Sequence, residues 1–213
     1  DTDGGKVHDT DAFRELNPNY LADRTLATSV HEPASSLNNM FYNMKLAETQ
    51  GQPGDWLFTG GGPASGKSSG PAGLLRESAD LVYDGTLANY DSIAPRIDAA
   101  LSSGKQVEVA FVLRDPEKAI RQAAMRAMGQ KAEVGSGRTI PINWFSGMHV
   151  DARNTVKRLN ERYADNDAFK ITVTNNQGGI NDARLGTLDE VVEIDYNETV
   201  RKVTSVLEEM RNE

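Results

Sequence analysis

Residues 56–68 read Trp-Leu-Phe-Thr-Gly-Gly-Gly-Pro-Ala-Ser-Gly-Lys-Ser, an apolar run that passes directly into a glycine-rich loop. The loop matches the pattern G-x-x-x-x-G-K-[ST] at Gly61, Gly66, Lys67 and Ser68. Glycines let the backbone wrap closely round phosphate groups, so that amide N–H groups point at the anionic oxygens. The apolar strand before the loop and a helix predicted from about Lys67 to Ser78 are the context that such a loop requires. The stretch therefore predicts a phosphate-binding loop, or P-loop.

The whole loop is assigned to a bound nucleotide. Lys67 is expected to reach the β- and γ-phosphates, and the hydroxyl of Ser68 is expected to bind Mg²⁺. ATP is the expected nucleotide and GTP the alternative, although the sequence has no N-K-x-D motif for guanine. The predicted nucleotide-binding residues are Gly61, Gly62, Pro63, Ala64, Ser65, Gly66, Lys67, Ser68 and Ser69.

Strand-like runs alternate with helical patterns along the chain. Strands are predicted at 6–8, 56–59, 81–83, 107–113, 170–173 and 191–194, and helices at 12–16, 31–50, 67–78, 92–102, 116–128, 142–163 and from 198 onward. This alternation is typical of an α/β fold, in which a parallel sheet is covered by helices on both faces. With 213 residues, the chain is long enough for a single domain over 1–213.

The helix predicted from His31, with Pro33 in its first turn, carries apolar residues at roughly helical spacing. They are Leu37, Met40, Phe41, Met44 and Leu46. We expect this stripe to face the core, with Met40 and Met44 as flexible core filler.

Composition excludes several classes of function. A net charge of -8 argues against a broad nucleic-acid surface, because neutralising phosphates requires clustered Lys and Arg. The sequence contains no cysteine, so disulfides, thiolate catalysis and cysteine-based zinc sites are ruled out. It has no apolar run of membrane-spanning length and does not open with a signal-peptide pattern. A cytoplasmic protein without membrane contact is expected.

A P-loop by itself does not distinguish NTP hydrolysis from phosphoryl transfer. A kinase also needs a carboxylate that takes the proton of the acceptor hydroxyl. Asp11, Asp84 and Asp115 each follow a predicted strand, and the ends of parallel strands lie along the edge that carries the P-loop. Aspartate at such a position more often caps a turn or helix. Asp115, which precedes Pro116, fits a helix cap best.

Mobile cations are the other requirement of a kinase. Arg126 and Arg138 flank a polar, glycine-rich segment, Gly129–Gly137. A flexible loop between two arginines suits a lid that closes on phosphates and excludes water. We therefore interpret residues 121–141 as a lid, although a single arginine of this kind is more often a solvated surface residue.

Several motifs together resemble the zeta-toxin-type kinases of toxin–antitoxin systems. The matching stretches are Asp9-Thr10-Asp11-Ala12-Phe13-Arg14-Glu15-Leu16-Asn17-Pro18, Val30-His31-Glu32-Pro33-Ala34-Ser35, the P-loop, Val82-Tyr83-Asp84-Gly85-Thr86-Leu87, Arg126-Ala127 and Gly137-Arg138-Thr139-Ile140-Pro141, with His149 as a further match. The resemblance implies a P-loop kinase that uses ATP and Mg²⁺ to phosphorylate UDP-N-acetylglucosamine or a similar nucleotide sugar. It leaves room for an antitoxin protein as a partner.

The resemblance also implies roles for individual residues. In the family, the second aspartate of the D-x-D-x-F-R motif activates the acceptor hydroxyl, which places this role on Asp11. Arg126 and Arg138 would clamp the triphosphate and, with Lys67, stabilise charge at the transferred phosphoryl group. The implied acceptor-binding residues are Arg14, His31, Glu32, Ser35, Asp84 and Thr86.

The order of the motifs departs from the family pattern. In the family the P-loop comes first, whereas here Asp11 lies 50 positions before Gly61 (61 − 11). We interpret this as a circular permutation or segment swap that retains the site, with residues 1–50 as the base and acceptor segment, residues 55–78 as the P-loop strand and helix, and Gly51–Gly54 as the joint. If the N-terminal segment docks elsewhere, Asp84 becomes the better candidate for the base.

Other functions remain open from the sequence. The main alternative is a P-loop NTPase or nucleotide-binding module that phosphorylates no acceptor. A kinase of another acceptor, such as NAD, is also compatible with the motifs, because the shape of the pocket decides the acceptor. A polynucleotide 5′-kinase would need a basic channel, which the net charge of -8 disfavours.

Overall fold

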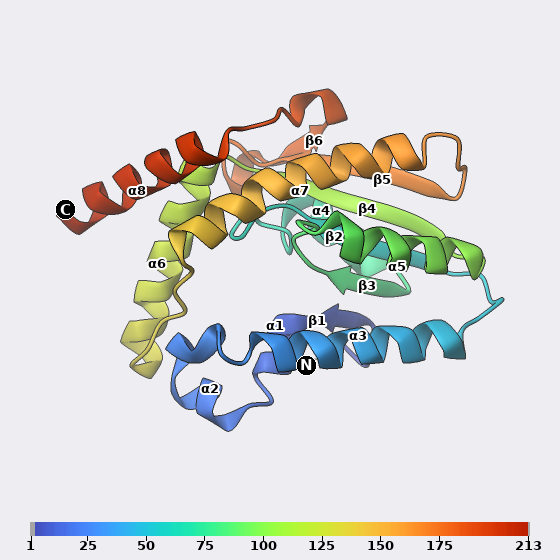
Figure 1. The fold of residues 1–213 in the computed structure, drawn as a ribbon, viewed down its shortest axis with the longest axis horizontal. Coiled ribbons are helices and arrows are strands. Elements are labelled where there is room, and N and C mark those ends of the chain that lie inside the picture. Colours follow the sequence, from blue (N-terminus) through green and yellow to red (C-terminus); the bar gives the residue numbers. More distant parts are fainter. Residues whose placement is uncertain (1–2, 213) are drawn as a thin grey trace.

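A computed structural model describes residues 3–212 of the chain. Six strands form one sheet in the order β1-β3-β2-β4-β5-β6 (Figure 1). Neighbouring strands are parallel except for β6, which runs antiparallel to β5. The strands are β1 (Val7–Asp9), β2 (Asp55–Gly60), β3 (Leu81–Asp84), β4 (Gln106–Leu113), β5 (Phe169–Asn175) and β6 (Arg184–Gly186). The predicted α/β fold with a mostly parallel sheet is therefore confirmed.

Helices cover both faces of the sheet, with α5 and α7 in front of it and α4 behind it in the view of Figure 1. The α-helices are α1 (Thr10–Arg14), α2 (Pro18–Ala22), α3 (His31–Glu48), α4 (Gly70–Ser78), α5 (Tyr90–Ser102), α6 (Pro116–Val134), α7 (Ile142–Arg162) and α8 (Tyr196–Asn212). Three short 3₁₀ helices are η1 (Arg24–Ala27), η2 (Ile180–Asp182) and η3 (Leu188–Glu190). Among the described residues, no helix is both long and apolar enough to span a membrane.

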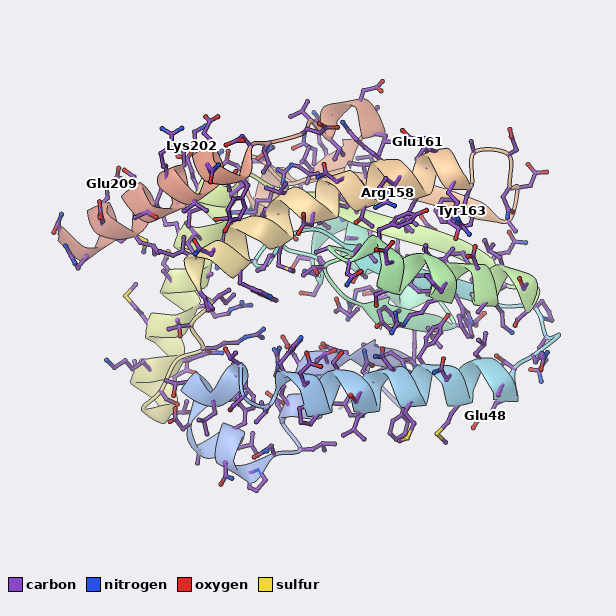
Figure 2. The ribbon with its side chains drawn as sticks, viewed as in Figure 1. Glu48, Arg158, Glu161, Tyr163, Lys202 and Glu209 are labelled. Carbon is purple, nitrogen blue, oxygen red and sulfur yellow. The ribbon has the colours of Figure 1, made fainter. Side chains whose placement is uncertain are left out.

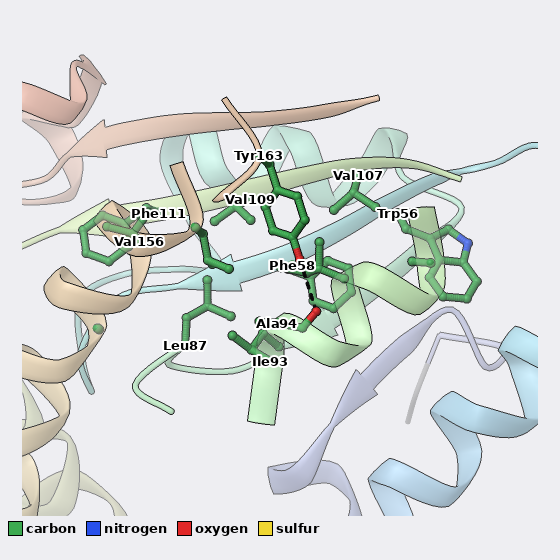
Figure 3. Packing of buried hydrophobic residues seen from close by; sticks show 14 of the residues in the cluster. Trp56, Phe58, Leu87, Ile93, Ala94, Val107, Val109, Phe111, Val156 and Tyr163 are labelled. Atoms are coloured by element: carbon green, nitrogen blue, oxygen red, sulfur yellow. Dashed lines mark hydrogen bonds between the residues drawn. The ribbon is translucent and has the colours of Figure 1, made fainter. Parts of the chain in front are cut away.

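The central strand β2 shows how the sequence builds two cores. Successive side chains of a strand point to opposite faces of the sheet. Trp56 and Phe58 accordingly join the larger core beneath α3, α5 and α7, whereas Leu57 joins a smaller one beneath α4. Figure 3 shows the larger core, where the hydroxyl of Tyr163 donates a hydrogen bond to the carbonyl of Ala94 (3.2 Å). Because β2 is buried on both faces, the loop that follows it starts from a fixed position.

The C-terminal helix α8 packs against α6 and α7 at one end of the molecule. It buries Thr199, Val203 and Val206 and leaves its charged side chains in solvent. Figure 2 shows Lys202 and Glu209 on this helix; Lys202 pairs with Glu198 (2.9 Å) within the helix.

The predicted apolar stripe of α3 is wrong for most of its members. Leu37, Met40, Phe41 and Met44 are exposed by 36–49%, and only Leu46 packs against the core. The helix instead buries Ala34, Asn38 and Tyr42. Tyr42 makes edge-on contacts with the rings of Trp56, Phe58 and Tyr83. With the imidazole of His8 as a fourth ring partner, this one large aromatic side chain sets the rotation of the helix.

Several predicted element boundaries also change. Helix α4 begins at Gly70 rather than near Lys67, because Gly66 (φ +92°) and Gly70 (φ +60°) both have backbone angles that interrupt a right-handed helix. Helix α6 continues through Gly129 to Val134 and ends at Gly135 (φ +83°), so most of the segment predicted as a flexible loop is helical. Residues 191–194 form no strand, and the short strand β6 at 184–186 was not predicted.

Candidate active site

The P-loop joins β2 to α4 in the middle of the sheet. Its backbone has positive φ at Gly61 (+122°), Ala64 (+57°) and Gly66 (+92°). A Cβ atom on Gly61 would lie 2.5 Å from the carbonyl oxygen of Val112, so that only glycine fits at this position. The amide of Gly61 donates to the carbonyl of Thr86 (3.0 Å), which ties the loop to the segment after β3.

The side chain of Lys67 turns back toward the first residues of the loop. Its ammonium group is 3.4 Å from the carbonyl oxygen of Gly61 and 3.5 Å from that of Gly62. Burial lowers the pKa of the Lys67 ammonium, while the negative charges of Asp84 and Asp11 act in the opposite direction. The lysine of the motif therefore interacts electrostatically with two of the three candidate bases, Asp84 and Asp11.

Two buried side chains brace the loop from outside. His149 on α7 contacts the carbonyl oxygen of Pro63 through Nε2 (3.1 Å), and its ring packs directly on Gly62. Asn176, just after β5, donates from Nδ2 to the carbonyl of Ser65 (2.7 Å). Burial, helped by the charge of Arg153, lowers the pKa of His149 to about 3, so the imidazole is neutral. Sequence reasoning missed Asn176, which no motif marks.

Asp11 is held between two arginines. Its Oδ1 pairs with Arg14, and its Oδ2 pairs with Arg138 at 2.5 Å. Partial burial would by itself raise the pKa of the Asp11 carboxyl, but the charges of Arg138 and Arg14 outweigh it and lower that pKa below its ordinary value. The side chain is still 51% exposed. Asp11 is therefore ionised and open to an approaching molecule.

Asp9 and Asp84 lie opposite each other on the neighbouring strands β1 and β3. Asp84 accepts a hydrogen bond from the hydroxyl of Thr59 (2.7 Å) and pairs with Arg76 (2.5 Å). Asp9 accepts from the backbone N–H of Asp11 (2.8 Å) and so caps α1. Burial, together with the negative charge of Asp84, raises the pKa of Asp9 to about 6.

The two predicted lid arginines approach this site from different directions. Arg126 is exposed on α6, and its charge acts on Lys67. Arg138 follows the end of α6, with its backbone N–H bonded to the side chain of Gln130 (3.0 Å) and its guanidinium on Asp11. Helix α6 and the segment after it thus bring positive charge to both the P-loop and Asp11.

The remaining predicted site residues are less closely grouped. His31, at the start of α3, receives a contact from Arg14 on Nδ1, and burial beside that arginine lowers the pKa of His31. Glu32 is exposed and Ser35 half-buried on the same helix, and the hydroxyl of Thr86 contacts the sulfur of Met148 (3.6 Å). Asp115 caps α6, as predicted: its carboxylate accepts from the backbone N–H groups of Glu117 (2.8 Å) and Lys118 (3.2 Å). That role removes Asp115 from the candidates for the base.

A family model named Zeta toxin matches residues 72–184, which is more than half of the chain. The chain belongs to the zeta toxin family. The matched region begins after the P-loop, so the N-terminal segment and the P-loop both precede it. The comparison with curated proteins gave no match.

Solved structures show the same fold at low sequence identity. The PezAT chromosomal toxin–antitoxin system of Streptococcus pneumoniae has a chain that is 14% identical, with a TM-score of 0.52 over 97% of this zeta toxin family member and 76% of that chain. A chain of the AvrRxo1-ORF1:AvrRxo1-ORF2 complex with sulphate ions is 15% identical, with a TM-score of 0.50 over 78% of this chain and 69% of that chain. A chain of the same complex with ATP is also 15% identical, with a TM-score of 0.50 over 78% of this chain and 68% of that chain.

Proposed function

We propose that this zeta toxin family member is an ATP-dependent kinase that phosphorylates a hydroxyl group of a small molecule, with a nucleotide sugar such as UDP-N-acetylglucosamine as the expected acceptor. The observation that carries the proposal is the position of Asp11. Although it lies 50 residues before the P-loop, its carboxylate is paired with Arg138 and acts electrostatically on Lys67. A carboxylate beside cations and a phosphate loop is the arrangement that phosphoryl transfer to a hydroxyl requires.

Each charged group then has a role in the transfer. Asp11 accepts the proton of the acceptor hydroxyl while that oxygen attacks the γ-phosphorus of ATP and ADP leaves. Lys67, Arg126 and Arg138 neutralise the charge that develops on the transferred group and on the leaving oxygen. Residues 121–141 act as the lid, because they carry both arginines.

Asp11 is a better candidate for the base than Asp84, because its side chain is more exposed. The side chain of Asp84 is 17% exposed, and its two oxygens are engaged by Thr59 and Arg76. The side chain of Asp11 is 51% exposed, and one of its two partners, Arg138, belongs to the lid. When Arg138 turns to the triphosphate, one oxygen of Asp11 becomes available for the acceptor.

The proposal includes Mg²⁺, for which Ser68 is the candidate ligand. Among the described residues, no three His, Cys, Asp or Glu side chains gather as a metal site. Mg²⁺ in nucleotide sites usually keeps several waters and binds phosphates with only one or two protein groups, so the loop hydroxyl fits it. When bound with ATP, the ion would supply positive charge at the β- and γ-phosphates.

The proposal also includes the residues that bind the acceptor and a protein partner. Arg14, His31, Glu32, Ser35, Asp84 and Thr86 would contact the acceptor. Cationic, imidazole and hydroxyl groups of this kind suit a polar, anionic molecule such as a nucleotide sugar. An antitoxin is proposed as a protein partner, because solved structures of the same fold come from a toxin–antitoxin system.

The test is incubation with ATP and Mg²⁺ and a panel of acceptors: UDP-N-acetylglucosamine, NAD and short oligonucleotides, with products identified by mass spectrometry. Asp11→Asn is expected to abolish the phosphorylated product, and Asp84→Asn to weaken but retain it. Asp115→Asn is the matched control, because asparagine also caps helices and activity should persist. ATP hydrolysis that depends on Lys67 but needs no acceptor would replace the kinase with the NTPase alternative.

A further inference from the structure

Asn176 occupies a place that no sequence motif predicts. Its side chain is 2% exposed and reaches the P-loop across 111 positions of sequence. Its backbone is fixed independently: its N–H donates to the carbonyl of Leu113 (2.9 Å), and its carbonyl accepts from Arg114 (3.2 Å). The amide group is therefore held at the ends of two neighbouring strands, β4 and β5.

The bond from Asn176 Nδ2 to the carbonyl oxygen of Ser65 is 2.7 Å long. In a planar trans peptide, the carbonyl of one residue and the N–H of the next point in opposite directions. Drawing the Ser65 carbonyl outward, toward Asn176, thus turns the Gly66 N–H away from Asn176. Without this bond the peptide between Ser65 and Gly66 would be free to rotate, since Gly66 tolerates almost any backbone angle.

The packing at Gly66 shows how closely the amide fits. A Cβ atom on Gly66 would lie 2.6 Å from Asn176 Nδ2, and Gly66 has φ +92°. The second glycine of the motif is therefore required here both by the backbone angle and by the side chain packed against it. His149 makes the equivalent bond to the carbonyl of Pro63 (3.1 Å), which sets the N–H of Ala64 in the same way.

Resting on the proposed function, we infer that Asn176 is a positioning residue for ATP: it holds the Ser65–Gly66 peptide so that the Gly66 N–H is preorganised toward the phosphates. Amide groups set before the ligand arrives lose no binding free energy to reorganisation. Leu, Ala or Asp at this position cannot donate to the Ser65 carbonyl. The requirement is for a short amide donor.

The experiment is calorimetric titration of the full chain with ATP in the presence of Mg²⁺. Asn176→Asp keeps the shape of the side chain but places a carboxylate oxygen against the Ser65 carbonyl, and Asn176→Ala removes the donor without adding charge. Loss of one buried hydrogen bond predicts an increase in Kd of about tenfold for the alanine variant and more for the aspartate variant. Asn175→Ala is the matched control, because Asn175 Nδ2 bonds to Glu190 and not to the P-loop.

Thermal unfolding separates positioning from loss of structure. Asn175→Ala loses two side-chain hydrogen bonds, to Glu190 and from the backbone N–H of Gln177, and Asn176→Ala loses one. Both variants should lower Tm, but only Asn176→Ala is expected to weaken ATP binding. Values of Kd within twofold of wild type for both Asn176 variants would overturn the inference. If Asn176→Ala does not fold, Asn176→Asp decides alone. Wild-type protein whose ATP binding is absent or insensitive to Lys67→Ala would instead overturn the proposed function itself.

Discussion

Gly62 gives the sharpest test of the packing around the P-loop. A Cβ atom added there would lie 2.3 Å from ring atoms of His149, which is more than 1 Å inside ordinary contact. His149 is 1% exposed, so the ring has no solvent to move into. Gly62 does not have a positive φ, and alanine is therefore acceptable to the backbone itself. The cost of Gly62→Ala should come from this single overlap.

Overpacking of this kind costs about 1–3 kcal/mol. For a domain of this size, each kcal/mol lowers Tm by about 2–4 °C. The measurement is urea unfolding followed by circular dichroism, for wild type, Gly62→Ala, His149→Ala and the double variant. In the His149→Ala background the overlap is gone, so Gly62→Ala should cost close to nothing, which gives a coupling energy of about 1–3 kcal/mol.

Gly129→Ala is the matched control for this cycle. Gly129 lies inside α6, and a Cβ atom there meets nothing within 4 Å. The substitution should stabilise the protein by up to about 1 kcal/mol, because alanine is a much better helix former than glycine. Equal costs of Gly62→Ala in the presence and absence of His149 would refute the overlap as the cause.

Four further substitutions test the charged and titratable groups of the fold. Arg138→Ala removes a positive charge that lowers the pKa of Asp11, so the acidic limb of the pH–rate profile should move to higher pH; an unmoved limb would exclude Asp11 as the titrating base. The pKa of Asp9 in the folded protein is raised to about 6, so its protonated carboxyl adds to the free energy of unfolding below pH 4, and this contribution is lost as pH rises to 6. Asp9→Asn still caps α1, and its free energy of unfolding, measured across this pH range, should not show that loss. His149 has a pKa of about 3 in the folded protein, so it makes the free energy of unfolding rise with pH between 3 and 6.5. His149→Phe should flatten this rise. Lys105→Met leaves two carbonyls without their buried donor and should lower the free energy of unfolding by about 3 kcal/mol without changing ATP affinity.

The parts of the site that the sequence predicted are those with local causes. Positive φ angles at Gly61 and Gly66 are needed by the loop itself, and they appear in the sequence as glycines at fixed spacing. The resemblance assigned Asp11 and Arg138 to one site, but it did not predict their ion pair. Residues 127 positions apart leave no local pattern. Asn176 had no signal, since an asparagine after a strand usually marks only a turn.

The rotation of α3 was unpredictable for a different reason. The helix carries two stripes at helical spacing, one with four large apolar side chains and one with Ala34, Asn38 and Tyr42. Hydrophobicity favours the first stripe. The fold selects the second, because the aromatic pocket beneath it is made by Trp56, Phe58 and Tyr83 from two strands that lie later in the chain. Spacing identifies the candidate faces of a helix, but only its neighbours decide which one is buried.

The reversed order of the motifs can be reconciled with the sheet by following its connections. From β1 to β2, from β3 to β4 and from β4 to β5, the chain moves in one direction across the sheet, and the helices α3, α5 and α7 contribute to one core. From β2 to β3 it moves in the opposite direction, and α4 contributes to the other core. Crossover connections that move in opposite directions on opposite faces of the sheet have the same handedness. Connections between parallel strands strongly prefer a single handedness. Placing the P-loop unit after α3 therefore violates no rule of connection.

The same contacts predict that the chain can be reordered. Lys6 Nζ donates a hydrogen bond to the carbonyl of Glu77 (2.8 Å), so the end of α4 lies beside the start of β1. The amide of Asp80 donates to the carbonyl of Asp55 (2.8 Å), so the joint at 51–54 lies beside the start of β3. A chain in the order 55–79, 3–54, 80–212, with a short Gly/Ser linker at the first new junction, has the motif order that the resemblance implies for the family, and both junctions span short distances. It should show the far-UV circular dichroism of the original chain and bind ATP within about threefold, because the site depends on strand positions and not on their order. If the reordered chain folds but has lost its Lys67-dependent ATP binding, the connection through α3, and not the sheet, holds the site together.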